Sequence, residues 1–242
     1  MQKKSLQFRE RLIVANHGFG NRPAAIVIHE TDNTAPSAGA LNHSLYFGTP
    51  GVKVSCHYVV DDGEIIRLLS HDKAAWHCGR PLTGYGNHNT IGIEICVNGG
   101  YFSAWYRTAL LTAALMDELG IEVLLRHRDV SGKYCPRRML DQPQLWERFC
   151  RIVAGQRKHW VLKQNASWQK PNPVKDEAAI GIVTAGILNV RSGRGMEFPV
   201  IGTLSRGEPV RLLNLLRDWW SIDYGVNVGF INKKYIVPIG QF

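Results

Sequence analysis

The pattern of apolar residues changes once along this 242-residue chain, and the change limits how the chain can fold. Up to about residue 154, short apolar runs alternate with helical patterns, which is typical of an α/β domain with helices covering a sheet. After about residue 178, short strand-like runs follow one another between Gly, Asn, Ser and Pro. The segment between them is polar and contains Pro171 and Pro173. We therefore expect a domain over 1–154, a linker over 155–177 and a second domain over 178–242.

The first segment predicts a mixed sheet flanked by helices. Strands are expected at three apolar or β-branched runs, residues 24–28, 90–97 and 123–125. Asp61-Asp62-Gly63 separates two further runs and predicts a hairpin turn. Ser103 is the expected N-cap of a helix that Gly120 ends. Leu145, Phe149 and Ile152 recur at helical spacing and form the apolar face of a last expected helix.

The second segment predicts a small all-β barrel. Five short strands are expected, at residues 181–183, 188–191, 209–216, 219–224 and 228–232. Five strands within about 65 residues, separated by turn-forming residues, are typical of such a barrel.

The charge of the chain favours a polyanionic partner but not one localised patch. The formal net charge is +9 and the pI is about 9.5. Lys+Arg minus Asp+Glu is 17−14 for residues 1–154, 5−2 for 155–177 and 7−4 for 178–242, which gives +3 for each part. An evenly spread charge suits an anionic cell wall better than a nucleic-acid patch, and no nucleic-acid-binding motif is visible. We expect no nucleic-acid partner.

The N-terminal region predicts neither export nor membrane insertion. Its apolar stretch is only Leu12–Ala15, too short for a secretory signal, and no run reaches the roughly 18–20 apolar residues of a membrane helix. The five cysteines are an odd number, which argues against a disulfide-stapled scaffold. We expect synthesis in the cytoplasm without a signal peptide, with at least one cysteine free.

Two histidines and one cysteine have the chemistry of a metal site. His29 directly follows the apolar run 24–28, His127 closely follows the run 123–125, and Cys135 lies eight residues after His127. Two imidazoles and a thiolate suit Zn²⁺, and a fourth position left to water is typical of a catalytic zinc site. From spacing alone, unrelated core and surface residues are the favoured interpretation, and a zinc site is the alternative.

The amino-acid sequences of several segments, taken in order, identify a family more specifically than any single residue spacing does. VIHETDN, SCHYVVDDGEIIRLL, AAWHCG, NHNTIGIEICVN and HRDVSGKYCPRRML resemble the zinc-dependent N-acetylmuramoyl-L-alanine amidases of the type-2 family, which includes phage endolysins and peptidoglycan recognition proteins. The resemblance covers roughly residues 20–153. The tail, with LNVRSG at 188–193 and GFI at 229–231, resembles the bacterial SH3 wall-binding domain.

The resemblance implies a set of site residues. His29, His127 and Cys135 are the implied ligands of one catalytic Zn²⁺, and Glu94 and Lys133 fall at catalytic positions. Burial in an apolar strand would raise the pKa of Glu94 and suit it to take a proton from water. Lys133 lies close enough in sequence to Cys135 to stabilise an oxyanion. The competing interpretations are a solvent-facing carboxylate, a plain surface lysine and a buried thiol.

Other polar residues of these segments have less defined roles. His57 and His77 are candidates for holding the glycan or peptide of the substrate, and buried structural roles are as compatible with the sequence. Many family members carry a catalytic tyrosine where this chain has Cys56. By strand alternation Cys56 and Tyr58 should share a face, with Tyr58 displaced by two residues. This departure favours Glu94 as the base.

The function implied by the resemblance is peptidoglycan hydrolysis. The expected reaction cleaves the amide between N-acetylmuramic acid and L-alanine, in a phage or prophage endolysin that reaches the wall after its release from the cytoplasm. The alternatives are a bacterial autolysin of the same chemistry and a recognition protein that binds without cleaving. The expected partner is bacterial peptidoglycan, without nucleic acid or membrane insertion, and the sequence indicates no oligomeric state.

Overall fold

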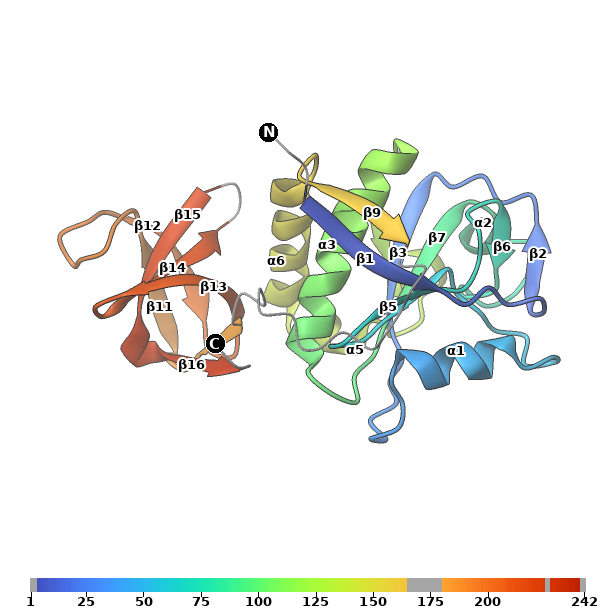
Figure 1. Cartoon of the computed structure of the whole chain (residues 1–242), viewed down its shortest axis with the longest axis horizontal. Coiled ribbons are helices and arrows are strands. Elements are labelled where there is room, and N and C mark those ends of the chain that lie inside the picture. Colours follow the sequence, from blue (N-terminus) through green and yellow to red (C-terminus); the bar gives the residue numbers. More distant parts are fainter. Residues whose placement is uncertain (1–3, 165–179, 225–226, 240–242) are drawn as a thin grey trace. The chain divides into compact units, whose positions relative to one another are not determined.

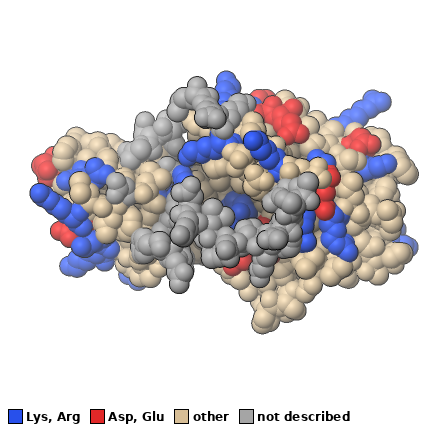
Figure 2. All heavy atoms as spheres, viewed as in Figure 1, with Lys and Arg blue, Asp and Glu red and all other residues tan. Residues whose placement is uncertain are grey.

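The chain consists of two compact units, Met1–Pro171 and Asn172–Phe242 (Figure 1). The computed structural model describes residues 4–164, 180–224 and 227–239. None of the described helices is both long enough and apolar enough to span a bilayer. On the face shown in Figure 2, Lys and Arg side chains are distributed over both units.

A seven-stranded mixed sheet forms the centre of the first unit. In spatial order its strands are β8 (Val123–Arg126), β3 (Ala25–Glu30), β7 (Thr90–Ile95), β4 (Tyr58–Val60), β5 (Ile65–Arg67), β1 (Lys4–Glu10) and β9 (Trp160–Gln164). The strands from β8 to β4 are parallel, β5 is antiparallel to β4, β1 is parallel to β5, and β9 is parallel to β1. β2 (His17–Phe19) and β6 (Lys73–Ala75) form a separate antiparallel pair. The predicted strands and hairpin are confirmed.

Helices cover both faces of this sheet (Figure 1). α3 (Tyr101–Leu119) and α6 (Pro143–Gln156) pack on one face, and α1 (Ala40–Gly48) packs against β4 and β5 on the other. The shorter helices are α2 (Tyr85–His88), α4 (His127–Ser131) and α5 (Arg137–Asp141). Ile26 and Ile28 belong to the core under α3 and α6, so strand alternation turns His29 toward the opposite face.

The predicted linker over 155–177 is wrong at its N-terminal end. α6 continues to Gln156, and Trp160–Gln164 is strand β9, paired in register with β1. Trp160 and Leu162 pack against the main core, which stabilises this short stretch as a strand. The rest of the predicted linker, residues 165–177, lies outside the described residues.

The predicted hairpin turn also fixes the starts of two helices. Asp61 Oδ2 accepts the N–H of Ala40 at the first residue of α1, at 2.9 Å. Asp62 Oδ2 accepts the N–H of Gly100 at 2.7 Å, so α3 begins at Tyr101 with Gly100 as its N-cap. The predicted N-cap at Ser103 is therefore wrong, because a carboxylate distant in sequence provides the cap.

The second unit is all-β, as predicted. Its sheet order is β12 (Val200–Ser205), β11 (Ile187–Arg191), β15 (Asn227–Asn232), β14 (Trp219–Tyr224), β13 (Pro209–Leu216), β10 (Ile180–Val183) and β16 (Ile236–Ile239). All of these neighbouring pairs are antiparallel. The five predicted strands are present, and β12 and β16 are additional. The core is mainly aliphatic and includes Val190, Ile222 and Ile231.

Candidate functional site

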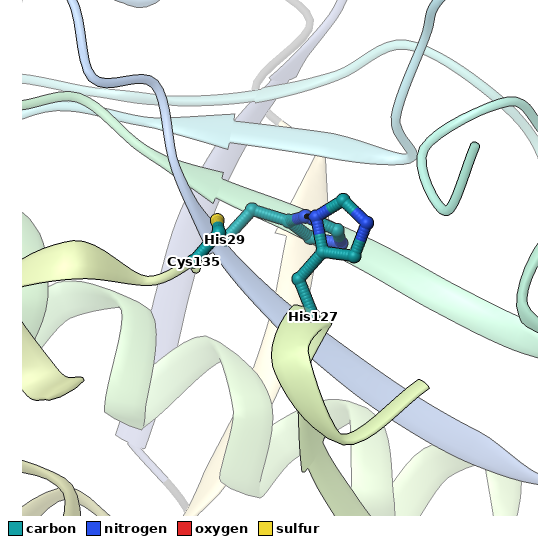
Figure 3. Close-up of side chains that lie close together, drawn as sticks. All are labelled: His29, His127 and Cys135. Carbon is teal, nitrogen blue, oxygen red and sulfur yellow. Dashed lines mark hydrogen bonds between the residues drawn. The ribbon is translucent and has the colours of Figure 1, made fainter. Parts of the chain in front are cut away.

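His29, His127 and Cys135 come together at one edge of the sheet (Figure 3). His29 is near the end of β3, and His127 begins α4 directly after the neighbouring strand β8. The two Nδ1 atoms lie 2.9 Å apart, and one donor atom from each of the three residues lies within 4.8 Å of the others. All three side chains are buried. The structure therefore brings together the three ligands predicted from the sequence.

The loop after α4 returns Cys135 to His127. Gly132 ends α4 with a φ of +79°, a left-handed conformation that glycine adopts without strain. The N–H of Arg128 then donates to the carbonyl of Cys135 at 3.0 Å. This closed loop explains why an eight-residue separation in the sequence becomes a contact in space.

Glu30 anchors the same loop to β3, a role the sequence did not indicate. Its backbone N–H donates to Cys135 Sγ at 3.4 Å. Its carboxylate accepts the hydroxyl of Tyr101 and, at 2.9 Å, the N–H of Arg138. Burial raises the pKa of Glu30, and the two hydrogen bonds oppose that rise. No spacing signal could have revealed these contacts, because they join segments more than 70 residues apart.

Glu94 lies beside the cluster on β7. It is paired with His29 in the parallel β3–β7 register, and its Oε1 lies 3.9 Å from His29 Nδ1. Its side chain is only 16% exposed, and Oε2 has no hydrogen-bond partner among the described residues. Burial raises the pKa of Glu94 to about 7, although the Lys133 ammonium acts to lower it. Such a carboxylate is able to accept a proton near neutral pH.

Lys133 and part of the cluster line a pocket of about 1010 Å³. Glu94, His127, Lys133 and Cys135 all line it, with part of α1 on another side. Lys133 is exposed, and its charge acts on His29, His127 and Glu94. The predicted catalytic pair and two of the three predicted ligands, His127 and Cys135, therefore line one cavity, and His29 lies behind His127.

The donor set fits a zinc ion. Burial lowers the pKa of His29 well below its usual value and that of His127 to about 4, so both are neutral at pH 7 with a lone pair available. Burial raises the pKa of the Cys135 thiol to about 12, so a cation must displace its proton to bind sulfur. Zn–N bonds of about 2.0–2.1 Å in a tetrahedral site place two ligand nitrogens ~3.3 Å apart, which is close to the separation seen here.

Two family profiles match the chain, one in each unit. The profile described as N-acetylmuramoyl-L-alanine amidase matches residues 19–138, and the one described as bacterial SH3 domain matches residues 186–237. The solved structure of the catalytic domain of XlyA is 35% identical, with 62% of this chain and 99% of that chain covered and a TM-score of 0.55. The chain belongs to the N-acetylmuramoyl-L-alanine amidase family. The two units are called the amidase unit and the SH3 unit below.

Other relatives agree with this assignment. The structure of PlyL is 31% identical over 61% of this chain and 97% of that chain, with a TM-score of 0.56. The N-acetylmuramoyl-L-alanine amidase CwlH of Bacillus subtilis (strain 168) is 38% identical over 142 residues, which are 57% of this chain and 56% of that protein. The amidase XlyA of the same organism is 38% identical over 152 residues, 61% of this chain and 50% of that protein. The chain thus spans about half the length of the curated relatives it matches.

His57 does not lie in the pocket of the amidase unit. It is fully buried; the N–H of Gly92 lies 3.0 Å from its Nδ1, and its Nε2 lies 3.0 Å from the carbonyl of Lys73. Both ring nitrogens are therefore bonded to the backbone, and burial lowers the pKa of His57 to about 3. The predicted contact with substrate therefore has no free ring nitrogen to make it, and the hydrogen bonds of His57 join parts of the fold.

His77 lines the pocket, but its ring nitrogens are directed at protein groups. Nδ1 lies 2.8 Å from His29 Nε2, and Nε2 lies 3.1 Å from Thr90 Oγ1. The structure places His77 behind His29, and the predicted contact with substrate has no free ring nitrogen to make it.

Cys56 and Tyr58 do not share a face, contrary to the sequence-based expectation. Cys56 belongs to the core on the α1 side, whereas Tyr58 belongs to the core under α3 and α6. Regular alternation begins only at Tyr58, the first residue of β4. The Tyr58 hydroxyl lies 2.8 Å from His71 Nε2, so it is engaged away from the pocket.

Proposed function

We propose that the chain is a peptidoglycan hydrolase that cleaves the amide bond between N-acetylmuramic acid and L-alanine of the stem peptide. One observation carries this proposal. Glu94, with a buried carboxylate oxygen that has no described partner, lies beside a buried His-His-Cys cluster in the pocket of a chain that belongs to the amidase family.

The proposed cofactor is one Zn²⁺ held by His29, His127 and Cys135. When bound, zinc supplies Lewis-acid polarisation of a carbonyl and activation of water. The protein side of this site is rigid, because β3, the start of α4 and the closed loop after α4 each hold one ligand.

Glu94 is the proposed proton carrier. As a carboxylate it accepts a proton when water adds to the scissile carbonyl carbon. It then returns that proton to the alanine nitrogen as the carbon–nitrogen bond breaks, so the products are a muramic carboxylate and a free amine. Lys133 is proposed to stabilise the negative charge on the carbonyl oxygen.

The SH3 unit is proposed to hold the enzyme at the wall. A second binding site raises the local concentration of substrate around the amidase unit without changing the chemistry. We propose that the chain acts as an endolysin-type enzyme on the wall after release from the cytoplasm. Its similarity to a mutant endolysin from Bacillus subtilis, 35% identical over 99% of that chain with a TM-score of 0.55, supports this proposal.

Digestion of purified peptidoglycan, followed by mass spectrometry, tests the activity. The expected products are glycan strands with intact muramic acid and peptides with a new N-terminal L-alanine, and a zinc chelator should abolish their release. New reducing sugar ends without N-terminal alanine would instead indicate a glycosidase. Wall binding without any product would indicate a recognition protein.

A further inference from the structure

The loop after β6 holds His77 against β7 in a fixed orientation. The backbone N–H groups of His77 and Cys78 both donate to Asn87 Oδ1, at 3.0 and 2.8 Å. The His77 ring lies over Gly92, where a Cβ would come within 2.6 Å of His77 Cγ. The missing side chain on β7 therefore leaves the space through which the ring reaches His29.

Thr90 determines where the proton of His77 lies. Its Oγ1 is 2.6 Å from the carbonyl oxygen of Gly86 and 3.1 Å from His77 Nε2. Two oxygens approach this closely only when a proton lies between them, so the hydroxyl donates to Gly86. Since its single hydrogen is used, Thr90 Oγ1 accepts from the Nε2–H of His77. A neutral His77 then has its lone pair on Nδ1.

That lone pair determines the tautomer of His29. His77 Nδ1 lies 2.8 Å from His29 Nε2, so His29 Nε2–H is the donor. The other nitrogen of His29, Nδ1, is left unprotonated. It faces His127 Nδ1 at 2.9 Å and lies 3.9 Å from Glu94 Oε1, on the pocket side.

We propose that Thr90 and His77 are positioning residues that hold His29 in the tautomer whose Nδ1 presents its lone pair to the metal. This inference rests on the proposed function, since it assumes that the cluster binds zinc. Ligand histidines in general donate their second N–H to a partner, and loss of that partner typically weakens metal binding about 10–100-fold. Here the partner is a second imidazole, and its own tautomer is fixed by a threonine.

Cys78 offers a competing arrangement that the test must separate. Its Sγ lies 3.3 Å from His77 Nδ1, and His29, His77 and Cys78 together form a second possible donor set. If a metal occupied that set, both nitrogens of His29 would be ligands and neither would carry a proton. The two arrangements therefore differ in the number of bound ions and in the protonation of His29 Nε2.

Zinc affinity, measured on the full chain by competition with a chromophoric chelator, gives the first readout. His77→Leu removes the acceptor and should weaken zinc binding by about 10–100-fold. His77→Asn retains a side-chain oxygen as acceptor and should restore most of the affinity. Thr90→Val should weaken zinc binding by less than His77→Leu does. Thr90→Ser, which retains the hydroxyl, should leave zinc affinity unchanged. Equal zinc affinity in His77→Leu and the wild type overturns the proposal, as does a second bound zinc that Cys78→Ala removes.

The second readout is the set of histidine tautomers in the zinc-loaded wild type, measured by long-range ¹H–¹⁵N correlation spectra. Because it uses the wild type, it holds even if a variant fails to fold. Protons on Nε2 of both His29 and His77 are expected, with the Nδ1 signal of His29 shifted by zinc. A proton on His29 Nδ1 overturns the proposal. If these tautomers and one zinc are found but the wall is not cleaved, the proposed function fails while this inference stands.

Discussion

The amidase unit and the SH3 unit fill their interiors in different ways. The amidase unit buries four histidines, His29, His57, His77 and His127, together with Glu30. Among the described residues of the SH3 unit, the buried side chains are mostly aliphatic, and Glu208 and Ser221 are the buried polar ones. Burying a polar group is costly unless it is hydrogen-bonded, so the amidase unit needs a specific partner for each.

Within the amidase unit, buried polar groups that stabilise the fold can be distinguished from those that serve the site. His57 has both ring nitrogens bonded to the backbone and serves the fold. Glu94 keeps a buried oxygen without a described partner, at the side of a pocket. At Glu94 the unsatisfied oxygen lies beside the pocket, where a ligand can complete its hydrogen bonding.

Glu94→Gln should produce the largest effect and confine it to the amidase unit. The amide cannot accept the proton, so turnover should fall by about 10²–10⁴-fold, while bound zinc and wall binding stay unchanged. Release of N-terminal alanine and zinc content by mass spectrometry measure both. Wild-type turnover in this variant would refute the assignment of Glu94 as base.

Ile222→Ala should damage only the SH3 unit. Ile222 on β14 is fully buried in the barrel core, and its truncation should cost about 2–5 kcal/mol of that unit's stability. Retention on walls should fall, whereas cleavage of a soluble muramoyl peptide should not. Val237→Ala, at a side chain that is 54% exposed, is the control. Loss of soluble-substrate cleavage in Ile222→Ala would show that the two units do not act separately.

Acid should destabilise the amidase unit more than the SH3 unit, which contains no histidine. The pKa of His57 is about 3 and that of His71 about 4, both below the unfolded value of about 6.5. The unfolded state therefore binds more protons below pH 6.5, and stability falls as pH falls toward the folded pKa values. The lowered pKa of His57 alone should reduce the free energy of unfolding of the amidase unit by about 2 kcal/mol between pH 7 and pH 5.

Calorimetry of the full chain at pH 7 and pH 5 measures this difference. The raised pKa of Glu94 acts in the opposite direction, but several histidines of the amidase unit have lowered pKa values. A larger fall in melting temperature for the SH3 unit would contradict the prediction.

Asp61→Ala should give the smallest effect. Loss of the cap on α1 should cost the amidase unit about 1 kcal/mol and raise KM for soluble substrate, because α1 lines the pocket. Thermal melts and initial rates measure the two effects, with the exposed Glu118→Ala as control. An unchanged melting temperature would show that the cap is dispensable.

The sequence predicts those parts of the fold whose signal is local. β3 and β7 are buried runs, and the turn after β4 contains Asp-Asp-Gly, so both are visible within a few residues. β1 and β9 pair across more than 150 residues at one edge of the sheet, and each has a weak pattern alone. Such pairing depends on the tertiary structure, so the local pattern alone predicts a linker where β9 forms.

The candidate site shows the same limit. The resemblance implied His29, His127 and Cys135, and the structure brings them together. The position of His77 behind His29 depends on Gly92 and on a loop from elsewhere in the chain, so no spacing indicated it.

The β1–β9 pair sets a practical rule for exchanging wall-binding modules between enzymes of this kind. A catalytic fragment cut at residue 154, the predicted end of the first domain, would lose β9 and expose the backbone of β1 from Lys4 to Phe8. Unpaired strand edges promote association between chains. Splicing after Gln164 keeps the sheet edge intact, so chimeras joined there should remain monodisperse where shorter ones aggregate.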